Sequence, residues 1–156
     1  ADALCQQRAE ATGRAGEFVA WVSAEGDDAY CRLVGGHGTR DEGCGGVMEQ
    51  PGPGWVSTDG YPLADDLAGL EAGLVAPLLA DEDGAPLLGR PSVHTGTNPD
   101  GRRRVVGDMS FDCAGWTSAS PRVQGSGGIA SGVGRYWSAF YSGGCDREAH
   151  LYCLER

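Results

Sequence analysis

The C-terminal third of the chain begins with Ser110-Phe-Asp-Cys113-Ala-Gly-Trp116-Thr-Ser118, and we expect the rest of the chain to be organised around it. The stretch continues through Gly143-Gly-Cys145 and closes with Leu151-Tyr-Cys153-Leu-Glu155. Its two ends have the short apolar pattern of strands, and we expect them to pair. It holds three of the six cysteines, and Cys5, near the start of the chain, is expected to find its partner here.

The length and the cysteine content indicate one disulfide-rich domain. The 156 residues suffice for a single domain with a sizeable core, over residues 1–156. Six cysteines form an even set, and no Cys-x-x-Cys pair suggests zinc or redox work. Free thiols in a cytosolic protein are the alternative, but the number favours an oxidising compartment. We therefore expect a secreted or cell-surface protein.

The charge excludes several classes of partner. The net charge is −10, and all twelve basic residues are Arg. Such a chain is a poor candidate for broad binding to nucleic acid or to anionic membranes, and no apolar run approaches the roughly 20 residues of a membrane span. No charged-then-apolar leader precedes Ala1, which fits a removed signal peptide or a trimmed chain. The abundance of Gly, Ala and Arg suggests the codon bias of a GC-rich genome.

The first half of the chain predicts a helix, a strand and a long stapled loop. Asp2 can cap a helix that runs to about Thr12, with Leu4, Cys5 and Ala9 facing the core. Residues 17–23 read as a strand that is apolar on both faces and so covered on both sides. Residues 24–53 read as a loop pinned by a local Cys31–Cys44 bridge, because so long a loop without a staple is unusual.

The second half predicts short elements separated by turns. Leucines at helical spacing predict a helix over residues 63–72 and an extended segment over 74–79. Residues 81–84 form an acidic turn, 93–97 a short strand, and 98–101 a turn with Pro at its second position. A strand is expected to continue through Trp116 and Thr117. Residues 124–134 are predicted to be a flexible Gly/Ser-rich surface loop, and 136–141 an aromatic strand.

Five landmarks, in this order, resemble the endostatin-like branch of the C-type-lectin-like fold. They are Ala1-Asp-Ala-Leu-Cys5, Gly16-Glu-Phe18-Val-Ala20-Trp21-Val-Ser23, Val93-His-Thr-Gly96-Thr-Asn-Pro-Asp-Gly101-Arg102, Cys113-Ala-Gly-Trp116, and Cys145 through Leu151-Tyr-Cys153-Leu-Glu155. The resemblance implies an α+β domain with a twisted, mostly antiparallel sheet, two flanking helices and long loops. It also implies nested Cys5–Cys153 and Cys113–Cys145 bridges, a choice among fifteen pairings that cysteine arithmetic leaves open. Cys31–Cys44 is the pair left over.

The resemblance gives mixed indications of a metal or sugar site. The Glu-Pro-Asn, Gln-Pro-Asp and Trp-Asn-Asp motifs of calcium-dependent lectins are absent, and Asn98-Pro-Asp100 reads as a turn. Endostatin-like proteins bind zinc through N-terminal histidines, whereas the first histidine here is His37. Asp81, Glu82 and Asp83 supply hard oxygen ligands and are a candidate calcium site, against the alternative of a solvated acidic turn.

Two further groups of residues are candidates for ligand contact. Arg102, Arg103 and Arg104 form the only basic run, which is either a solvated strand edge or an anion-binding patch for a sulfated glycan or phosphate. Tyr136, Trp137 and Tyr141 adjoin the expected loop and could form a stacking platform, against the alternative that each belongs to the core.

The sequence offers little for catalysis. His37, His94 and His150 are isolated, and no metal-binding or nucleophile-elbow motif is present. A hydrolase would need a pocket that gathers one histidine with a carboxylate. We therefore expect a non-catalytic module that recognises a glycan or an extracellular protein, with a structural subunit of an extracellular assembly as the alternative.

Overall fold

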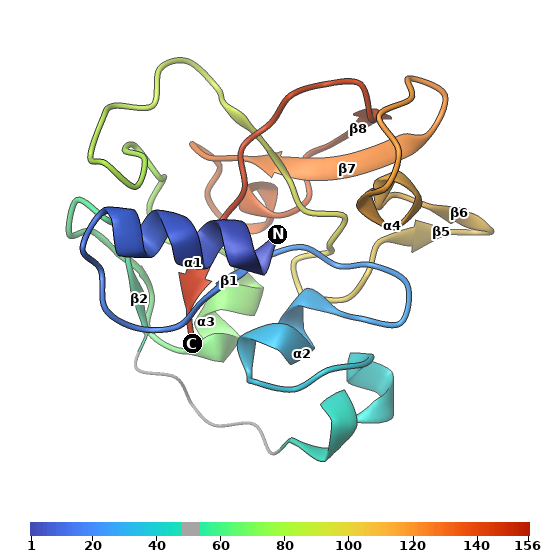
Figure 1. The fold of residues 1–156 in the computed structure, drawn as a ribbon, viewed down its shortest axis with the longest axis horizontal. Helices are drawn as coiled ribbons and strands as arrows, with labels where there is room; N and C mark the ends of the chain where they lie inside the picture. Colours follow the sequence, from blue (N-terminus) through green and yellow to red (C-terminus); the bar gives the residue numbers. More distant parts are fainter. Residues whose placement is uncertain (48–53) are drawn as a thin grey trace.

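A computed structural model describes residues 1–47 and 54–156. Its elements alternate between short helices and short strands (Figure 1). The helices and single helical turns are α1 Asp2–Ala11, α2 Ala29–Leu33, η1 Arg40–Glu42, η2 Cys44–Gly46, α3 Leu67–Ala72, α4 Cys113–Trp116 and η3 Arg135–Trp137. The strands are β1 Phe18–Ala20, β2 Trp55–Val56, β3 Pro62–Ala64, β4 Ser92–His94, β5 Val105–Val106, β6 Met109–Ser110, β7 Gln124–Ile129, β8 Tyr141–Gly144 and β9 Cys153–Glu155. The protein is thus a small α+β structure.

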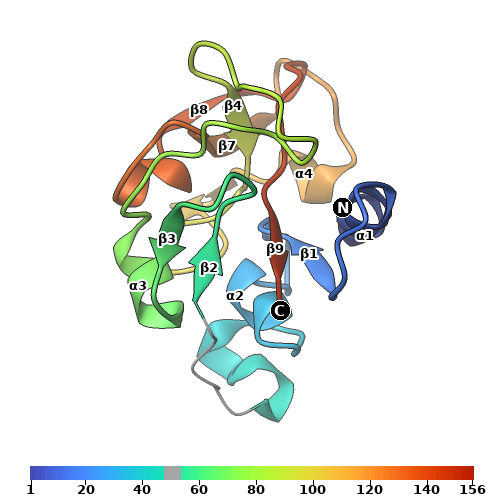
Figure 2. The ribbon, with the colours of Figure 1, turned by 90° about the vertical axis from the view of Figure 1, so that its left-hand side faces the viewer.

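The strands pair antiparallel in several short sheets rather than in one large sheet. Among the described residues, β4, β7 and β8 form a three-stranded sheet with β7 in the centre, and the other pairs are β1–β9, β2–β3 and β5–β6. The pairing of β1 with β9 joins the two ends of the chain. The predicted pairing between the two ends of the C-terminal stretch is wrong, because β6 at its start pairs with β5, whereas β9 at its end pairs with β1. In Figure 2, β9 runs between α1 on one side and β2 and β3 on the other.

All three predicted disulfides are present. They are Cys5–Cys153, Cys31–Cys44 and Cys113–Cys145, and no cysteine is left free. Cys5–Cys153 spans 148 residues and attaches α1 to the last strand. In the chain-entropy treatment, closing so long a loop stabilises the fold by roughly 4–5 kcal/mol.

The strand at residues 18–20 is covered on both faces, as predicted. Val19 and Trp21 belong to the main hydrophobic core, whereas Ala20 and Val22 pack with Cys5 in a second cluster beneath α1. The helix prediction is also correct in extent, but two of its details are wrong. Leu4 is 48% exposed. The Asp2 carboxylate does not cap the helix; it accepts a hydrogen bond from Ala20 N–H and pairs with Arg32.

The predicted loop at residues 124–134 is wrong. Residues 124–129 are β7, and positions 125–130 are buried. Its glycines permit close backbone packing: a Cβ at Gly127 would lie 1.8 Å from the Val93 carbonyl oxygen, and one at Gly128 would lie 1.5 Å from that of Trp137. The composition that suggests a loop therefore reflects a crowded central strand.

Three other predicted boundaries change for local reasons. The helix predicted from residue 63 begins at Leu67, because Asp66 caps it by accepting a hydrogen bond from Gly69 N–H at 2.7 Å. The aromatic segment at 136–141 is not a strand: Tyr136 and Trp137 end the 3-10 turn η3, residues 138–140 form a bend, and β8 begins only at Tyr141. The strand predicted through Trp116 is wrong, since Cys113–Trp116 forms a helical turn.

Candidate binding site

The backbone at Cys113–Trp116 is left-handed over four consecutive residues. The φ angles of Cys113, Ala114, Gly115 and Trp116 are +53°, +54°, +65° and +65°. Three of these residues carry a Cβ, and each such residue costs roughly 1–2 kcal/mol in this conformation. A run of this kind persists only where surrounding contacts enforce it, and such outliers cluster at functional sites.

Four contacts hold the left-handed turn, two of them within the turn and its flanks and two to distant parts of the chain. The Cys113–Cys145 disulfide fixes its start, and Trp116 N–H donates to the Asp112 carbonyl at 2.7 Å. The Trp116 indole Nε1–H donates to the Ser23 carbonyl at 3.0 Å. The Thr117 hydroxyl donates to the Ala114 carbonyl at 2.7 Å. These contacts fix the indole in one orientation.

The turn forms one wall of a shallow hollow of about 510 Å³. This volume lies within the range of small-ligand sites, about 300–1,000 Å³. The residues that line the hollow are His94, Cys113, Trp116, Ser118, Cys145, Arg147, Glu148 and Ala149. The hollow therefore combines an aromatic wall, a disulfide and two charged side chains of opposite sign.

His94 is held in one orientation by hydrogen bonds at both ring nitrogens. Its Nε2 lies 3.1 Å from the Arg147 carbonyl, which can only accept, so we assign the ring proton to Nε2. In the neutral ring, Nδ1 then accepts from the Tyr141 hydroxyl at 3.4 Å. The His94 ring centroid lies 5.9 Å from that of Trp116 and 6.5 Å from that of Tyr141. The three rings thus form one aromatic group at the hollow.

Burial keeps Tyr141 protonated. Desolvation raises the pKa of its phenol above the ordinary value, while the Ser92 hydroxyl and the Arg147 charge oppose the shift in part. The phenol therefore remains a hydrogen-bond donor to His94 at physiological pH.

The arrangement is suited to holding a ring-shaped ligand. The aromatic faces can stack on an apolar ring face, and the Arg147 and Glu148 side chains can bind polar substituents. The hollow does gather a histidine with a carboxylate, which a hydrolase would need. In this arrangement both nitrogens of His94 are engaged by protein groups, the Arg147 carbonyl and the Tyr141 hydroxyl.

Of the predicted aromatic residues, one lies at this group and two do not. Tyr141 contacts His94. Trp137 is 0% exposed and packs between Trp21 and Tyr152, with ring centroids 5.1 and 5.2 Å away, so the prediction that it contacts a ligand is wrong. Tyr136 is 48% exposed but packs edge-on against Phe140 and does not line the hollow.

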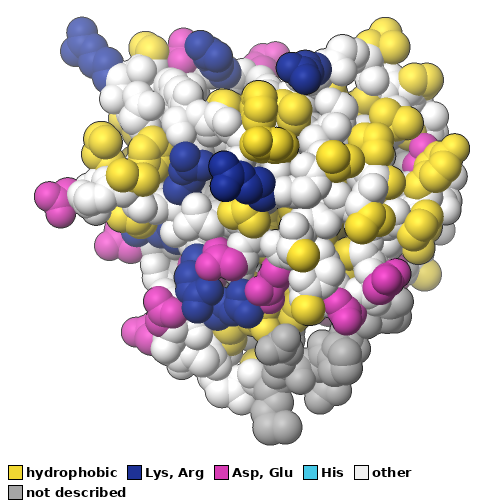
Figure 3. All heavy atoms as spheres, turned by 180° about the vertical axis from the view of Figure 1, so that it is seen from behind, with side chains coloured by type: hydrophobic (Ala, Val, Ile, Leu, Met, Phe, Trp, Pro, Cys, Tyr) yellow, Lys and Arg dark blue, Asp and Glu magenta, His cyan; other side chains and the backbone are white. Residues whose placement is uncertain are grey.

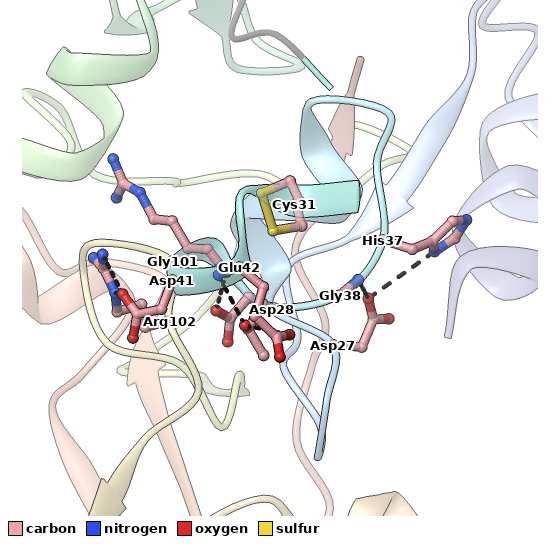
Figure 4. The surroundings of a disulfide bond; sticks show 12 residues. Asp27, Asp28, Cys31, His37, Gly38, Asp41, Glu42, Gly101 and Arg102 are labelled. Atoms are coloured by element: carbon pink, nitrogen blue, oxygen red, sulfur yellow. Dashed lines mark hydrogen bonds and ion pairs between the residues drawn. A yellow bond between two sulfur atoms is a disulfide. The ribbon is translucent and has the colours of Figure 1, made fainter. Parts of the chain in front are cut away.

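The arginine run is largely neutralised within the protein. Arg102 pairs with Asp100 at 2.8 Å and with Asp41 at 3.0 Å, and Figure 4 shows Asp41 pointing toward it. Arg103 pairs at 2.7 Å with Asp112, which is 0% exposed. The guanidinium of Arg104 lies 5.6 Å from the Phe111 ring centroid. The run therefore does not form a three-arginine patch free to bind an anion.

The acidic turn is present, but the carboxylates of Asp81 and Glu82 are engaged by partners in the protein. The Asp81 side chain accepts hydrogen bonds from Asp83 N–H and Ala85 N–H at 3.0 and 2.8 Å. Glu82 pairs with Arg8 at 3.3 Å. Among residues 1–47 and 54–156, no three His, Cys, Asp or Glu side chains form a group that could hold a metal ion. The calcium site predicted at Asp81, Glu82 and Asp83 thus has no assembled ligand set.

Sequence reasoning did not select His94, Trp116 and Arg147. His94 and Trp116 lie inside the landmark segments, but the first was treated as isolated and the second as a core strand residue. The implied pairing of Cys113 with Cys145 was the one signal that could have brought Trp116 and Arg147 together, because each lies within three residues of a bridged cysteine.

A scan against models of protein families and a search of curated protein sequences find no match for the chain. In the described part of the chain, no helix is long and apolar enough to cross a bilayer.

Proposed function

We propose that the protein is an extracellular, non-catalytic binding module of the endostatin-like, C-type-lectin-like type, which recognises a glycan at the His94–Trp116 hollow. The α+β architecture, the antiparallel pairing and the nested disulfides support the proposed fold type. Three disulfides in a chain of this size are compatible with an oxidising, extracellular environment.

The left-handed turn is the observation that carries the ligand proposal. Three non-glycine residues there adopt a costly conformation, and the result is a Trp116 side chain presented beside His94 in an open hollow. A sugar ring has apolar faces for the aromatic wall and hydroxyls for Arg147 and Glu148. Such a ligand would use every class of group in the hollow.

A glycan array, run with calcium and again with a chelator, tests the proposal. We expect binding in both conditions, because no three His, Cys, Asp or Glu side chains of the described residues form a group that could hold a metal ion at the hollow. Arg147→Ala should weaken binding about tenfold or more, since a charge-assisted hydrogen bond is lost from an exposed side chain. Arg122→Ala, which removes an exposed arginine outside the hollow, is the control. A folded Arg147→Ala protein with unchanged affinity would remove the hollow as the site.

Exposed apolar side chains favour a second candidate, a structural subunit that assembles with other proteins or with itself. Val105, Val106 and Met109 on the β5–β6 hairpin are 47%, 55% and 57% exposed, and Tyr136 and Phe140 are 48% and 49% exposed. In Figure 3, hydrophobic side chains gather in several groups on the face seen from behind, between arginines and carboxylates. Sedimentation of the purified chain tests this candidate: concentration-dependent assembly that Met109→Glu abolishes would favour it over a monomeric glycan binder.

A further inference from the structure

A second and larger depression lies along the molecule's last strand. It has a volume of about 1040 Å³ and lies along β9, with α1 on one side and β2 and the segment of residues 78–87 on the other (Figure 2). Among its lining residues, only Ala149 also lines the His94–Trp116 hollow. We refer to it as the β9 groove.

The walls of the β9 groove are mainly hydrocarbon. The apolar residues of its floor belong to the main hydrophobic core, and partly exposed apolar residues form its rim. The floor residues are Leu33, Leu63, Leu67, Val93, Ala130 and Leu154, and the rim residues are Leu4, Phe18, Trp55, Val56, Leu78 and Leu87. Contiguous apolar surface of this kind, open to solvent and flanked by polar residues, marks ligand or partner sites.

Arg14 places an uncompensated positive charge at the groove. Its guanidinium donates one hydrogen bond, at 3.3 Å, to the Glu82 carbonyl oxygen and has no ion-pair partner among the described residues. Its Nε is buried and has no hydrogen-bond partner there. The nearby Glu82 carboxylate is already paired with Arg8 at 3.3 Å. The Nε–H of this partly buried arginine therefore lacks an acceptor among the described residues, which requires explanation in a chain of net charge −10.

We propose that the β9 groove binds a single-chain anionic amphiphile, with its hydrocarbon chain along the apolar walls and its anionic group at Arg14. The hydrocarbon accounts for the apolar floor and rim, and the anion supplies the acceptor that Arg14 lacks. A neutral hydrocarbon would satisfy only the first of these features, and a hydrophilic anion only the second.

Calorimetric titration with dodecanoate and with dodecan-1-ol tests the proposal. We expect dodecanoate to bind the wild-type chain about tenfold more tightly than the alcohol, because only the carboxylate accepts from the guanidinium. Arg14→Gln should remove that difference and leave the alcohol unaffected. Arg122→Gln, which removes an arginine outside the groove without an ion-pair partner among the described residues, should change neither affinity.

A second variant tests the hydrocarbon path. Val56 lines the groove and is 63% exposed, so Val56→Asp should leave the fold intact while placing a charge against the bound chain. It should weaken both ligands about tenfold or more. Equal affinity of the wild-type chain for acid and alcohol, or unchanged dodecanoate binding in Arg14→Gln, would overturn the proposal.

Sedimentation with phosphatidylcholine–phosphatidylglycerol vesicles separates a free amphiphile from a membrane surface. Co-sedimentation without dodecanoate binding would assign the groove to membranes and contradict the proposal. Failure here leaves the glycan proposal standing, because Arg14 and Val56 do not line the His94–Trp116 hollow.

Discussion

The segment closed by Cys31–Cys44 and the turn at Cys113–Trp116 are both irregular backbones fixed by a disulfide, but they obtain their left-handed residues differently. In the first, positive φ falls on the glycines Gly35, Gly38 and Gly43, with Cys44 the exception. In the second, it falls on Cys113, Ala114 and Trp116. Glycine adopts this conformation without steric penalty, whereas the other residues do not.

Of the two irregular segments, the one closed by Cys31–Cys44 is the more relaxed. The Cys31–Cys44 segment is anchored by carboxylates: Asp28 accepts from Arg40 N–H at 2.8 Å and from Arg103 N–H at 2.7 Å, and Asp27 lies toward Gly38 and His37 (Figure 4). Its backbone is relaxed by glycine and its polar groups are satisfied. The Cys113–Trp116 turn keeps non-glycine residues at positive φ, where glycine would relieve the strain. We infer that the placement of the Trp116 side chain matters more there than stability.

Arg103 joins the two segments and should give the largest effect. Its backbone N–H donates to the Asp28 carboxylate. Its side-chain Nε and Nη2 each lie 2.7 Å from the buried Asp112 carboxylate. Arg103→Met keeps the backbone contact but leaves the Asp112 charge buried without its partner. We expect a loss of about 3–5 kcal/mol in the free energy of unfolding, measured by urea denaturation.

Arg104→Met is the matched control for Arg103. Arg104 has a ring contact with Phe111 but no ion-pair partner among the described residues, so the loss should be at most about 1 kcal/mol. Adding Asp112→Asn to Arg103→Met should recover part of the loss because it removes the buried charge. Equal effects of the two arginine substitutions would show that Arg103–Asp112 does not couple the turn to the Asp28 anchor.

Removing either the Cys113–Cys145 or the Cys31–Cys44 disulfide should give similar losses of stability but different losses of structure. The bridges close sequence separations of 32 and 13 residues. In the chain-entropy treatment, Cys113→Ser/Cys145→Ser and Cys31→Ser/Cys44→Ser should therefore cost about 4 and about 3 kcal/mol. Only the first pair should release the Trp116 indole N–H from the Ser23 carbonyl.

Hydrogen exchange of the indole N–H groups, followed by NMR, measures that release. Trp116 should lose protection without Cys113–Cys145 and retain it without Cys31–Cys44, while the buried Trp21 indole, bonded to Ser138 at 2.9 Å, serves as an internal reference. Retained protection of Trp116 in both variants would mean that the turn does not depend on its disulfide.

The parts of the fold that sequence reasoning predicted depend on local patterns. The first helix, the two-faced strand at Phe18–Ala20 and the acidic turn follow from spacing and turn chemistry in a few residues. The disulfides followed from the resemblance and, for Cys31–Cys44, from the length of the loop. β7 could not be predicted this way: Gly128 is required by the Trp137 carbonyl, whose approach exists only after folding.

Most of the candidate site could not be predicted from the sequence, for the same reason. His94 meets Tyr141 and Arg147 because β4 and β8 both pair with β7, and β7 was predicted to be a loop. The left-handed turn carries only one glycine, Gly115, so its sequence gives little warning of positive φ. Trp137 was a candidate for a stacking platform because it adjoins the expected loop, with the core as the alternative, and its burial depends on the distant residues Trp21 and Tyr152.

Alkaline pH should test the buried phenols near the site. Burial raises the pKa of Tyr141 and, far more strongly, that of Tyr152, above the ordinary value of about 10. As the pH rises past about 10, the unfolded chain loses these protons first, so the free energy of unfolding should fall. The chain has no Lys and no free Cys, so tyrosines dominate the titration there.

Urea denaturation at about pH 8 and about pH 11 measures this dependence. Tyr152→Phe should flatten most of the decline and Tyr141→Phe a smaller part, whereas Tyr61→Phe, at a residue that is 56% exposed, should leave it unchanged. An unchanged decline in Tyr152→Phe would show that its phenol is not the group that opposes unfolding at lower pH.

The smallest effect bears most directly on the strain in the turn. Ala114 is exposed and has φ +54°, so Ala114→Gly removes no packing and relieves the left-handed penalty. After the extra entropy of an unfolded glycine, a gain of about 0.5–1 kcal/mol should remain in the free energy of unfolding. Gly115→Ala and Gly43→Ala, at φ +65° and +76° with nothing within 4 Å of the added Cβ, should each lose about 1 kcal/mol. If Ala114→Gly also lost stability, the turn would be as relaxed as the Cys31–Cys44 segment, and the strain that singles out the His94–Trp116 hollow as a site would be gone.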